Sequence, residues 1–207
     1  MTRATGEDKR SDYPPHCHGH SLSLSVKDTT KNCKLLSDTM DKAKEIVSLI
    51  KFSPKRENLL GELKGNLEGP ESEAKGIRDL CPTRWTVRAC CFQRILDNYA
   101  ALLQEWTIDE KLQSHIPGRI IGCRAQMNTF DFFFGLNLKQ RLFSQTDNLS
   151  RTLQQTKMSA LSGKRVAYLT KDVLQKMWND MSFRSFKVSV YPKWQPRVVV
   201  ASRSHVS

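Results

Sequence analysis

Apolar side chains recur every three or four residues along most of this 207-residue chain, and this spacing places them on one face of an α-helix. The pattern is clearest in residues 36–50, 92–106 and 166–178. The stripes consist of Leu36, Met40, Ala43, Val47 and Ile50; of Phe92, Ile95, Leu96, Tyr99, Leu102, Leu103 and Trp106; and of Val166, Leu169, Val173, Met177 and Trp178. The spacing predicts a mainly α-helical fold.

Capping residues, prolines and glycines predict where these helices begin and end. Ser53-Pro54 has the residue types of an N-cap and first helical position, and predicts a short helix to about Lys64. Three glycines and a proline make residues 65–79 a predicted loop. Thr107–Glu110 has capping-box spacing and predicts the start of another helix, and Pro117-Gly118 predicts a break.

The C-terminal half continues the helical pattern. Arg119 to about Leu142 is rich in aromatic residues and apolar on most sides, which predicts one helix buried between neighbours. Asp147 is a candidate cap of a short helix that follows it. Ser159–Asp180 is predicted to be the last helix. Beyond it we expect a basic, disordered tail, in which Val198–Val200 could form a stray strand.

The charge balance bears on the kind of partner. The net charge is +12, and a basic excess raises affinity for nucleic acid and other polyanions. The polar N-terminus lacks the apolar core of a signal peptide, and no apolar run reaches the roughly 18 residues of a membrane span. We therefore expect a soluble intracellular protein with nucleic acid as a possible partner and no membrane contact.

Cysteines and histidines suggest a metal site at first sight. Residues 16–20 read His-Cys-His-Gly-His, but no second close pair completes a four-ligand zinc site. The six cysteines form no CxxC pair and are expected to be reduced, mostly buried thiols. We predict no bound metal and no cofactor.

Two short motifs stand out: Cys17 and His20 have Cys-x-x-His spacing, and Arg84-Trp85 stands just before a predicted helix. These motifs resemble those of one family, the hAT-type DNA transposases. Residues 122–158 are similar to the helical domain inserted into the catalytic core in the zinc finger MYM-type protein 1-like subgroup. Together the likeness spans about residues 16–183.

The resemblance implies a role for each motif. In the family, the Cys-x-x-His motif supports the RNase H-like core without binding zinc, so Cys17 and His20 would be structural. The Arg-Trp motif helps to hold flipped or hairpin DNA ends, which would make Arg84 and Trp85 DNA contacts. An indole can stack on a base and a guanidinium can bind phosphate. A tryptophan just before a helix is more often a core anchor, and we favour that interpretation of Trp85.

The resemblance also implies a division of the chain. Residues 1–15 would be a flexible lead-in, and 16–64 a remnant of the RNase H-like core with the start of the helical region. The predicted loop at 65–79 would separate these from a helical insertion domain at 80–183. A basic, disordered tail would occupy 184–207.

The family's catalytic acids, two aspartates and a glutamate that hold two metal ions, have no match here. We therefore predict no enzyme and no catalytic residue. The expected function is an inactive transposase-derived fragment that retains non-specific nucleic-acid binding in the nucleus. Two alternatives stay open: a helical protein-interaction module recruited from a transposon, which could self-associate, and a fragment of a longer, active transposase.

Overall fold

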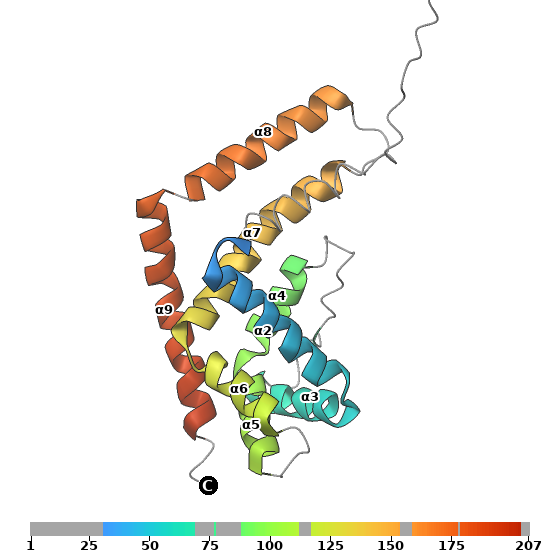
Figure 1. The fold of residues 1–207 in the computed structure, drawn as a ribbon, viewed down its shortest axis with the longest axis vertical. Coiled ribbons are helices and arrows are strands. Elements are labelled where there is room, and N and C mark those ends of the chain that lie inside the picture. Colours follow the sequence, from blue (N-terminus) through green and yellow to red (C-terminus); the bar gives the residue numbers. More distant parts are fainter. Residues whose placement is uncertain are drawn as a thin grey trace, which may run out of the picture.

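The computed structural model describes residues 31–68, 77, 88–111, 117–153, 159–177 and 179–203. Within these residues every regular element is an α-helix (Figure 1). The helices are α2 (Lys34–Lys51), α3 (Pro54–Glu68), α4 (Arg88–Asp97), α5 (Tyr99–Lys111), α6 (Pro117–Met127), α7 (Phe130–Leu153), α8 (Ala160–Met177) and α9 (Asp180–Arg203). The predicted mainly α-helical fold is confirmed for this part of the chain.

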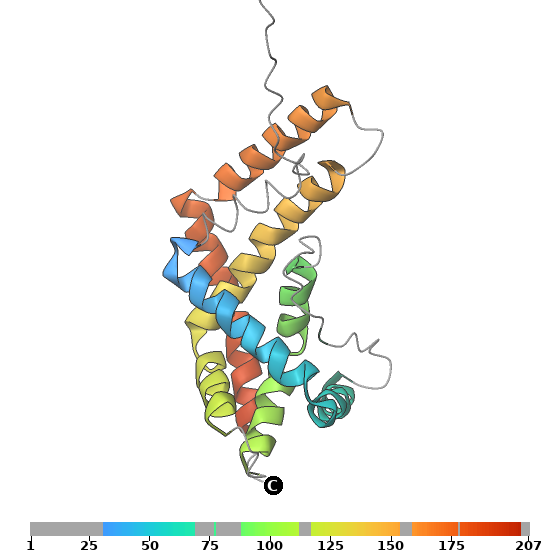
Figure 2. The same cartoon turned by 45° about the vertical axis from the view of Figure 1, so that its right-hand side comes forward.

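Helix α7 is the element on which most of the others pack. It contacts α2, α4, α6, α8 and α9, and it runs through the middle of the molecule in both views (Figures 1 and 2). Its apolar residues lie on several sides, so this one helix can pack against several others. Phe132, Phe133, Phe134, Leu136 and Phe143 are all buried. The sequence prediction that this segment is buried between neighbouring helices is confirmed.

Helices α2 and α3 follow the predicted pattern closely. Four of the five predicted apolar residues of α2 are buried, and α3 begins at Pro54 as expected. Helix α3 continues to Glu68, so the predicted end at Lys64 and the start of the loop at 65 are wrong. A single glycine such as Gly65 costs a helix only about 1 kcal/mol, which is not enough to end it. The rest of that predicted loop, apart from Ile77, lies outside the described residues.

The stripe in residues 92–106 is confirmed as a buried face, but it belongs to two helices. All seven of its predicted members are buried. The two helices meet at Asn98, whose side-chain amide and backbone N–H both donate hydrogen bonds to the Arg94 carbonyl oxygen, at 2.7 Å and 3.1 Å. The predicted helix start at Thr107–Glu110 is wrong, because α5 runs through these residues to Lys111 without a residue that would interrupt it.

The predicted single helix over 119–142 is also two helices. Helix α6 begins at Pro117, and the chain breaks at Asn128-Thr129 before α7. The hydroxyl of Thr129 accepts a hydrogen bond from the backbone N–H of Phe132 at 3.3 Å, as an N-cap does. Helix α7 then runs to Leu153, so Asp147 does not start a helix of its own.

The helix predicted over Ser159–Asp180 is confirmed as α8, although it ends at Met177 and is not the last helix, because α9 follows it. Ser159 caps α8 by accepting the N–H of Ser162 at 3.2 Å. The predicted disordered tail from 184 onward, with its stray strand at Val198–Val200, is wrong, because α9 extends to Arg203. We did not expect a helix there because Pro192 removes a helical hydrogen bond, at a cost of about 3 kcal/mol.

Aromatic packing on α7 explains why α9 forms despite its prolines. Rings at helical spacing on α9 meet two rings of α7: the Phe134 centroid lies 5.6 Å from that of Phe183 and 5.6 Å from that of Phe186. The Phe130 centroid lies 5.8 Å from that of Trp194. Full burial of a large apolar side chain contributes about 1.5–3 kcal/mol. The half-buried rings of α9, together with the buried Phe134 and Val190, therefore offset the two prolines, Pro192 and Pro196.

A polar cluster joins α2 to α6. Glu45 accepts hydrogen bonds from Lys42 Nζ at 2.7 Å and from Arg119 Nε at 3.3 Å. Burial opposes the charge on Glu45, but these two cations outweigh it and lower its pKa. Beside the cluster, burial and then the negative charge of Glu45 raise the pKa of the Cys123 thiol to about 12. This thiol is therefore neutral at physiological pH, as expected for a packing residue.

The other described cysteines fit their predicted role in part. Cys91 is buried and Cys90 half-buried, whereas Cys33 is exposed at the start of α2. Cys17 and Cys81 lie outside the described residues. None of the described helices combines the length and apolar character that crossing a membrane would require.

Gly135 sets how closely α2 approaches α7, which gives a first prediction. A Cβ atom at this position would overlap the Thr39 hydroxyl oxygen, and Thr39 is held by a 2.6 Å hydrogen bond to the Leu35 carbonyl. We expect Gly135→Ala to lower the free energy of unfolding in urea by about 2 kcal/mol, the usual cost of overpacking. Adding Thr39→Ala should restore part of the loss.

Gly122→Ala is the matched control, because it too adds a methyl group to a helical glycine. No atom of the described residues lies within 4 Å of that added Cβ. The change should leave stability equal or raise it by up to about 1 kcal/mol. Equal stability of the two single variants would contradict close helix packing at Gly135.

Candidate nucleic-acid interface

The residues singled out by the sequence motifs lie outside the described residues. This holds for Cys17 and His20 as well as for Arg84 and Trp85. The structure therefore neither brings these pairs together nor separates them. The nearest described residues to Arg84-Trp85 in the sequence are Ile77 and the start of α4 at Arg88.

The start of α4 is fixed to α7 by a buried carboxylate. The Asp147 Oδ2 atom accepts a hydrogen bond from the backbone N–H of Ala89 at 3.3 Å, and Asp147 is only 2% exposed. One turn further on, the Phe92 and Phe143 rings pack with centroids 5.7 Å apart. Asp147 thus caps a helix, as its residue type suggested, but the helix is α4 rather than one that follows it. Periodicity could not reveal this contact, because the two partners are 58 residues apart.

Helices α8 and α9, residues 160–203, form what we call the arm. Helix α8 lies alongside the C-terminal half of α7, and α9 turns back along α5 and the N-terminal half of α7 (Figures 1 and 2). Gly163 is buried, and Val166, Thr170, Leu174 and Met177 are half-buried. Their spacing places them on one face of α8, and α7 is the neighbour that α8 contacts most.

The side of α8 that faces away from α7 is exposed, so part of the predicted apolar stripe of this helix is wrong. Leu169 is 56% exposed and Val173 is 40% exposed, although both belong to the predicted apolar stripe of this helix. More generally, the described part of the chain has nine large hydrophobic residues that are exposed, and seven are on the arm. These seven are Leu161, Tyr168, Leu169, Val173, Met181, Val188 and Tyr191.

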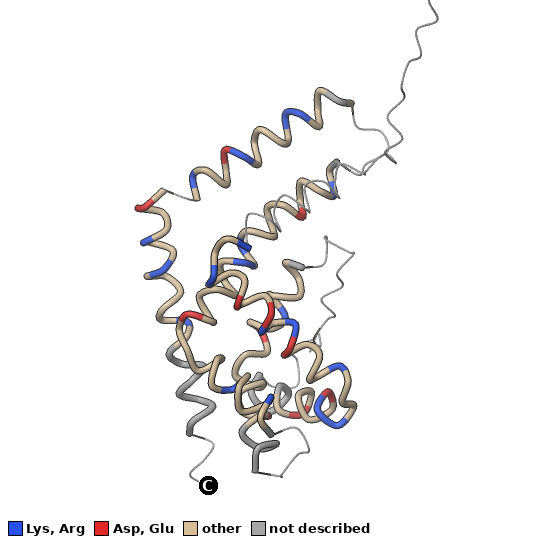
Figure 3. The backbone as a smooth tube through the Cα atoms, viewed as in Figure 1, with Lys and Arg blue, Asp and Glu red and all other residues tan. Residues whose placement is uncertain are grey.

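The arm also carries most of the excess positive charge. Residues 160–203 contain nine lysines and arginines and two aspartates, a net charge of +7 out of +12 for the whole chain. Lysines and arginines recur along both helices, with a single acid in α8 (Figure 3). The basic residues whose side chains the structure describes are Lys164, Arg165, Lys171, Lys176, Arg184, Lys187 and Lys193, and all are exposed. Exposed cations at this density attract phosphate groups.

A broad, open hollow on α8 combines charge with an aromatic ring. It is lined by Leu161, Ser162, Lys164, Arg165, Tyr168 and Leu169. The Lys164 Nζ atom lies over the Tyr168 ring, 5.9 Å from its centroid. An exposed ring next to cations can contact a base and its phosphate at the same time.

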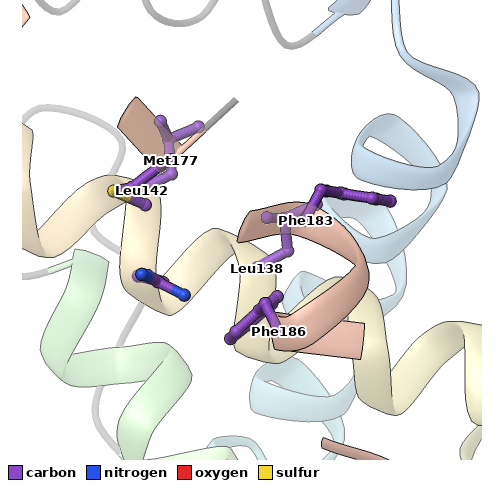
Figure 4. A pocket seen from close by; sticks show the side chains of 6 residues that line it. Leu138, Leu142, Met177, Phe183 and Phe186 are labelled. Atoms are coloured by element: carbon purple, nitrogen blue, oxygen red, sulfur yellow. The ribbon is translucent and has the colours of Figure 1, made fainter. Parts of the chain in front are cut away.

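Apolar side chains around a small pocket hold the turn between α8 and α9, which we call the elbow, against α7. Leu138 and Leu142 come from α7, Met177 ends α8, and Phe183 and Phe186 belong to the first turns of α9 (Figure 4). The guanidinium carbon of Arg141, the sixth lining residue, lies 4.9 Å from the centroid of the Phe186 ring. This packing fixes where the arm turns, and therefore which side of α8 is left uncovered.

Among the side chains that the structure describes, no group of three or more histidines, cysteines or acids is close enough to hold a metal ion. Histidines 16, 18 and 20 lie outside this part of the chain. The arm is therefore the surface for which the described residues suggest a binding chemistry.

The Asp147 cap yields a second prediction. Removing an N-capping side chain costs about 1–2 kcal/mol, so Asp147→Ala should lower the free energy of unfolding by that amount. Asp147→Asn keeps an acceptor oxygen and should lose less. The control is Asp131→Ala, which removes an exposed aspartate in the first turn of α7 and should cost less than about 1 kcal/mol. Equal losses for the Asp147→Ala and Asp131→Ala variants would contradict the cap.

No family model, curated protein or solved structure matches this chain. The likeness to hAT-type transposases therefore rests on the Cys-x-x-His and Arg-Trp motifs and the residues around them, and it remains a prediction.

Proposed function

We propose that this chain is a non-catalytic, transposase-derived helical domain that binds nucleic acid through the arm. The observation that carries the proposal is the combination of a net charge of +7 with seven exposed basic side chains on α8 and α9. The origin in a hAT-type transposase and a place in the nucleus follow from the sequence motifs. No catalytic role is assigned, because no residues match the family's three acids.

The physical basis is electrostatic. A cation that neutralises a phosphate releases counterions from the nucleic acid, and this release drives binding without regard to sequence. Binding of this kind weakens steeply as salt is raised. The proposal therefore predicts a site that is tolerant of sequence and sensitive to ionic strength, with affinity governed by the basic residues of the arm.

A second candidate function is protein binding. The seven exposed hydrophobic residues of the arm support it, because monomeric proteins seldom gather so many on one part of their surface. Self-association of α8 is the weaker form of this idea. Two copies would bring together two helices with four basic residues and one acid each, and like charges repel.

Charge reversal on the arm tests the proposal. Lys164→Glu combined with Arg165→Glu should lower affinity for a labelled 20-nucleotide DNA at least tenfold near 50 mM salt, as measured by fluorescence anisotropy. The slope of log affinity against log salt should become shallower by about 1.5, because two phosphate contacts are lost. DNA recovered from the same reactions after incubation with Mg²⁺ should be uncut.

The matched control reverses two exposed lysines elsewhere. Lys34→Glu combined with Lys55→Glu changes the net charge equally but lies at the starts of α2 and α3. It should weaken binding only slightly. Equal losses in the two double variants would show that overall charge, and not the arm, governs binding, and a wild-type protein that binds no DNA would refute the proposed function.

A further inference from the structure

Resting on the nucleic-acid function proposed above, we propose that the arm binds single strands in preference to duplexes, with unpaired bases stacking on Tyr168 and Tyr191. Both tyrosines stand among exposed basic residues, one on each helix of the arm. Each therefore offers what an unpaired nucleotide needs, a flat ring for the base and a nearby cation for the phosphate.

Tyr168 is the more accessible of the two rings. It is 56% exposed on the uncovered side of α8 and forms part of the open hollow that Leu161, Leu169 and Arg165 also line. The ammonium group of Lys164 lies over one face of the ring, 5.9 Å from the centroid, so a base would stack on the other face. A base stacked on this ring would have its phosphate within reach of Lys164 or Arg165.

Tyr191 is held in place by its neighbours while part of it stays exposed. Its ring centroid lies 5.3 Å from that of Phe130 on α7 and 6.0 Å from that of Trp194 on α9, yet the residue is 46% exposed. Lys187 and Arg184 precede it by one and two helical turns and so lie on the same side of α9. A ring fixed in this way loses little conformational freedom when a base stacks on it.

The exposed hydrophobic residues of the arm favour a single strand over a duplex. In a duplex the faces of the bases are covered by their neighbours, and a non-specific protein contacts mainly phosphates. Phosphate contacts alone would need only the lysines and arginines. Exposed tyrosines and aliphatic side chains among those cations match the exposed faces of unpaired bases.

The test compares two probes and several variants. A labelled 20-nucleotide oligothymidylate and a mixed-sequence duplex of 20 base pairs are titrated with the full chain under the same salt conditions. The wild type should bind the single strand more tightly. Tyr168→Leu and Tyr191→Leu should each lower single-strand affinity about tenfold, and each should leave duplex affinity unchanged within about twofold.

Matched variants separate stacking from folding. Tyr168→Phe and Tyr191→Phe keep the ring and should retain single-strand affinity. Phe52→Leu removes an aromatic residue that is 87% exposed outside the arm, and it should change neither affinity. Circular dichroism of each variant is compared with the wild type, and Tyr168→Leu, at an exposed position, keeps the test decisive if Tyr191→Leu unfolds.

The outcomes distinguish this inference from the proposed function. If arm charge reversal weakens binding to both probes while neither tyrosine variant affects the single strand, stacking is refuted and the nucleic-acid function stands. If the wild type binds neither probe, both fail. If polyglutamate of matched charge binds as tightly as the oligothymidylate, the arm recognises acidic chains in general, and the stacking role is overturned.

Discussion

The rest of the structure depends on the packing of aromatic side chains along α7. This helix presents rings to α4, α5 and α9, and it comes close enough to α2 that a methyl group at Gly135 would overlap Thr39. A helix that is apolar on several sides cannot be stable in water alone, so its neighbours are required to cover it. Besides α5, five other described helices contact it.

The same packing determines which surface remains for function. Phe183 and Phe186 attach the start of α9 to α7, and Met177 closes the elbow from the end of α8. With both ends of the turn fixed, α8 contacts α7 on one side and leaves the other uncovered. The exposed tyrosines, aliphatic residues and lysines of the arm result from this geometry. The combination of exposed aromatic rings, aliphatic side chains and positive charges supports nucleic acid as the partner.

The sequence pattern predicts the helices better than it predicts their boundaries or the helices against which they pack. The stripe in α2 and the start of α3 at Pro54 follow from local spacing, and both are confirmed. The breaks at Asn98 and Thr129 were missed because both fall inside an unbroken apolar pattern, and at Thr129 a single side-chain hydrogen bond caps the next helix. The helix at 180–203 was missed for the opposite reason: distant aromatic contacts outweigh a local signal from Pro192. The uncovered side of α8 likewise depends on what lies beside it, which no local pattern encodes.

Photocross-linking is the most direct test of the claim that the arm is the nucleic-acid surface. A single-stranded oligonucleotide containing 5-iodouracil is irradiated with the full chain, and the attached residues are identified by mass spectrometry. The account predicts cross-links in residues 160–194, centred on Tyr168 and Tyr191, that disappear when salt is raised. Cross-links confined to residues 34–63, or spread evenly over exposed aromatic residues including Phe52, would contradict it.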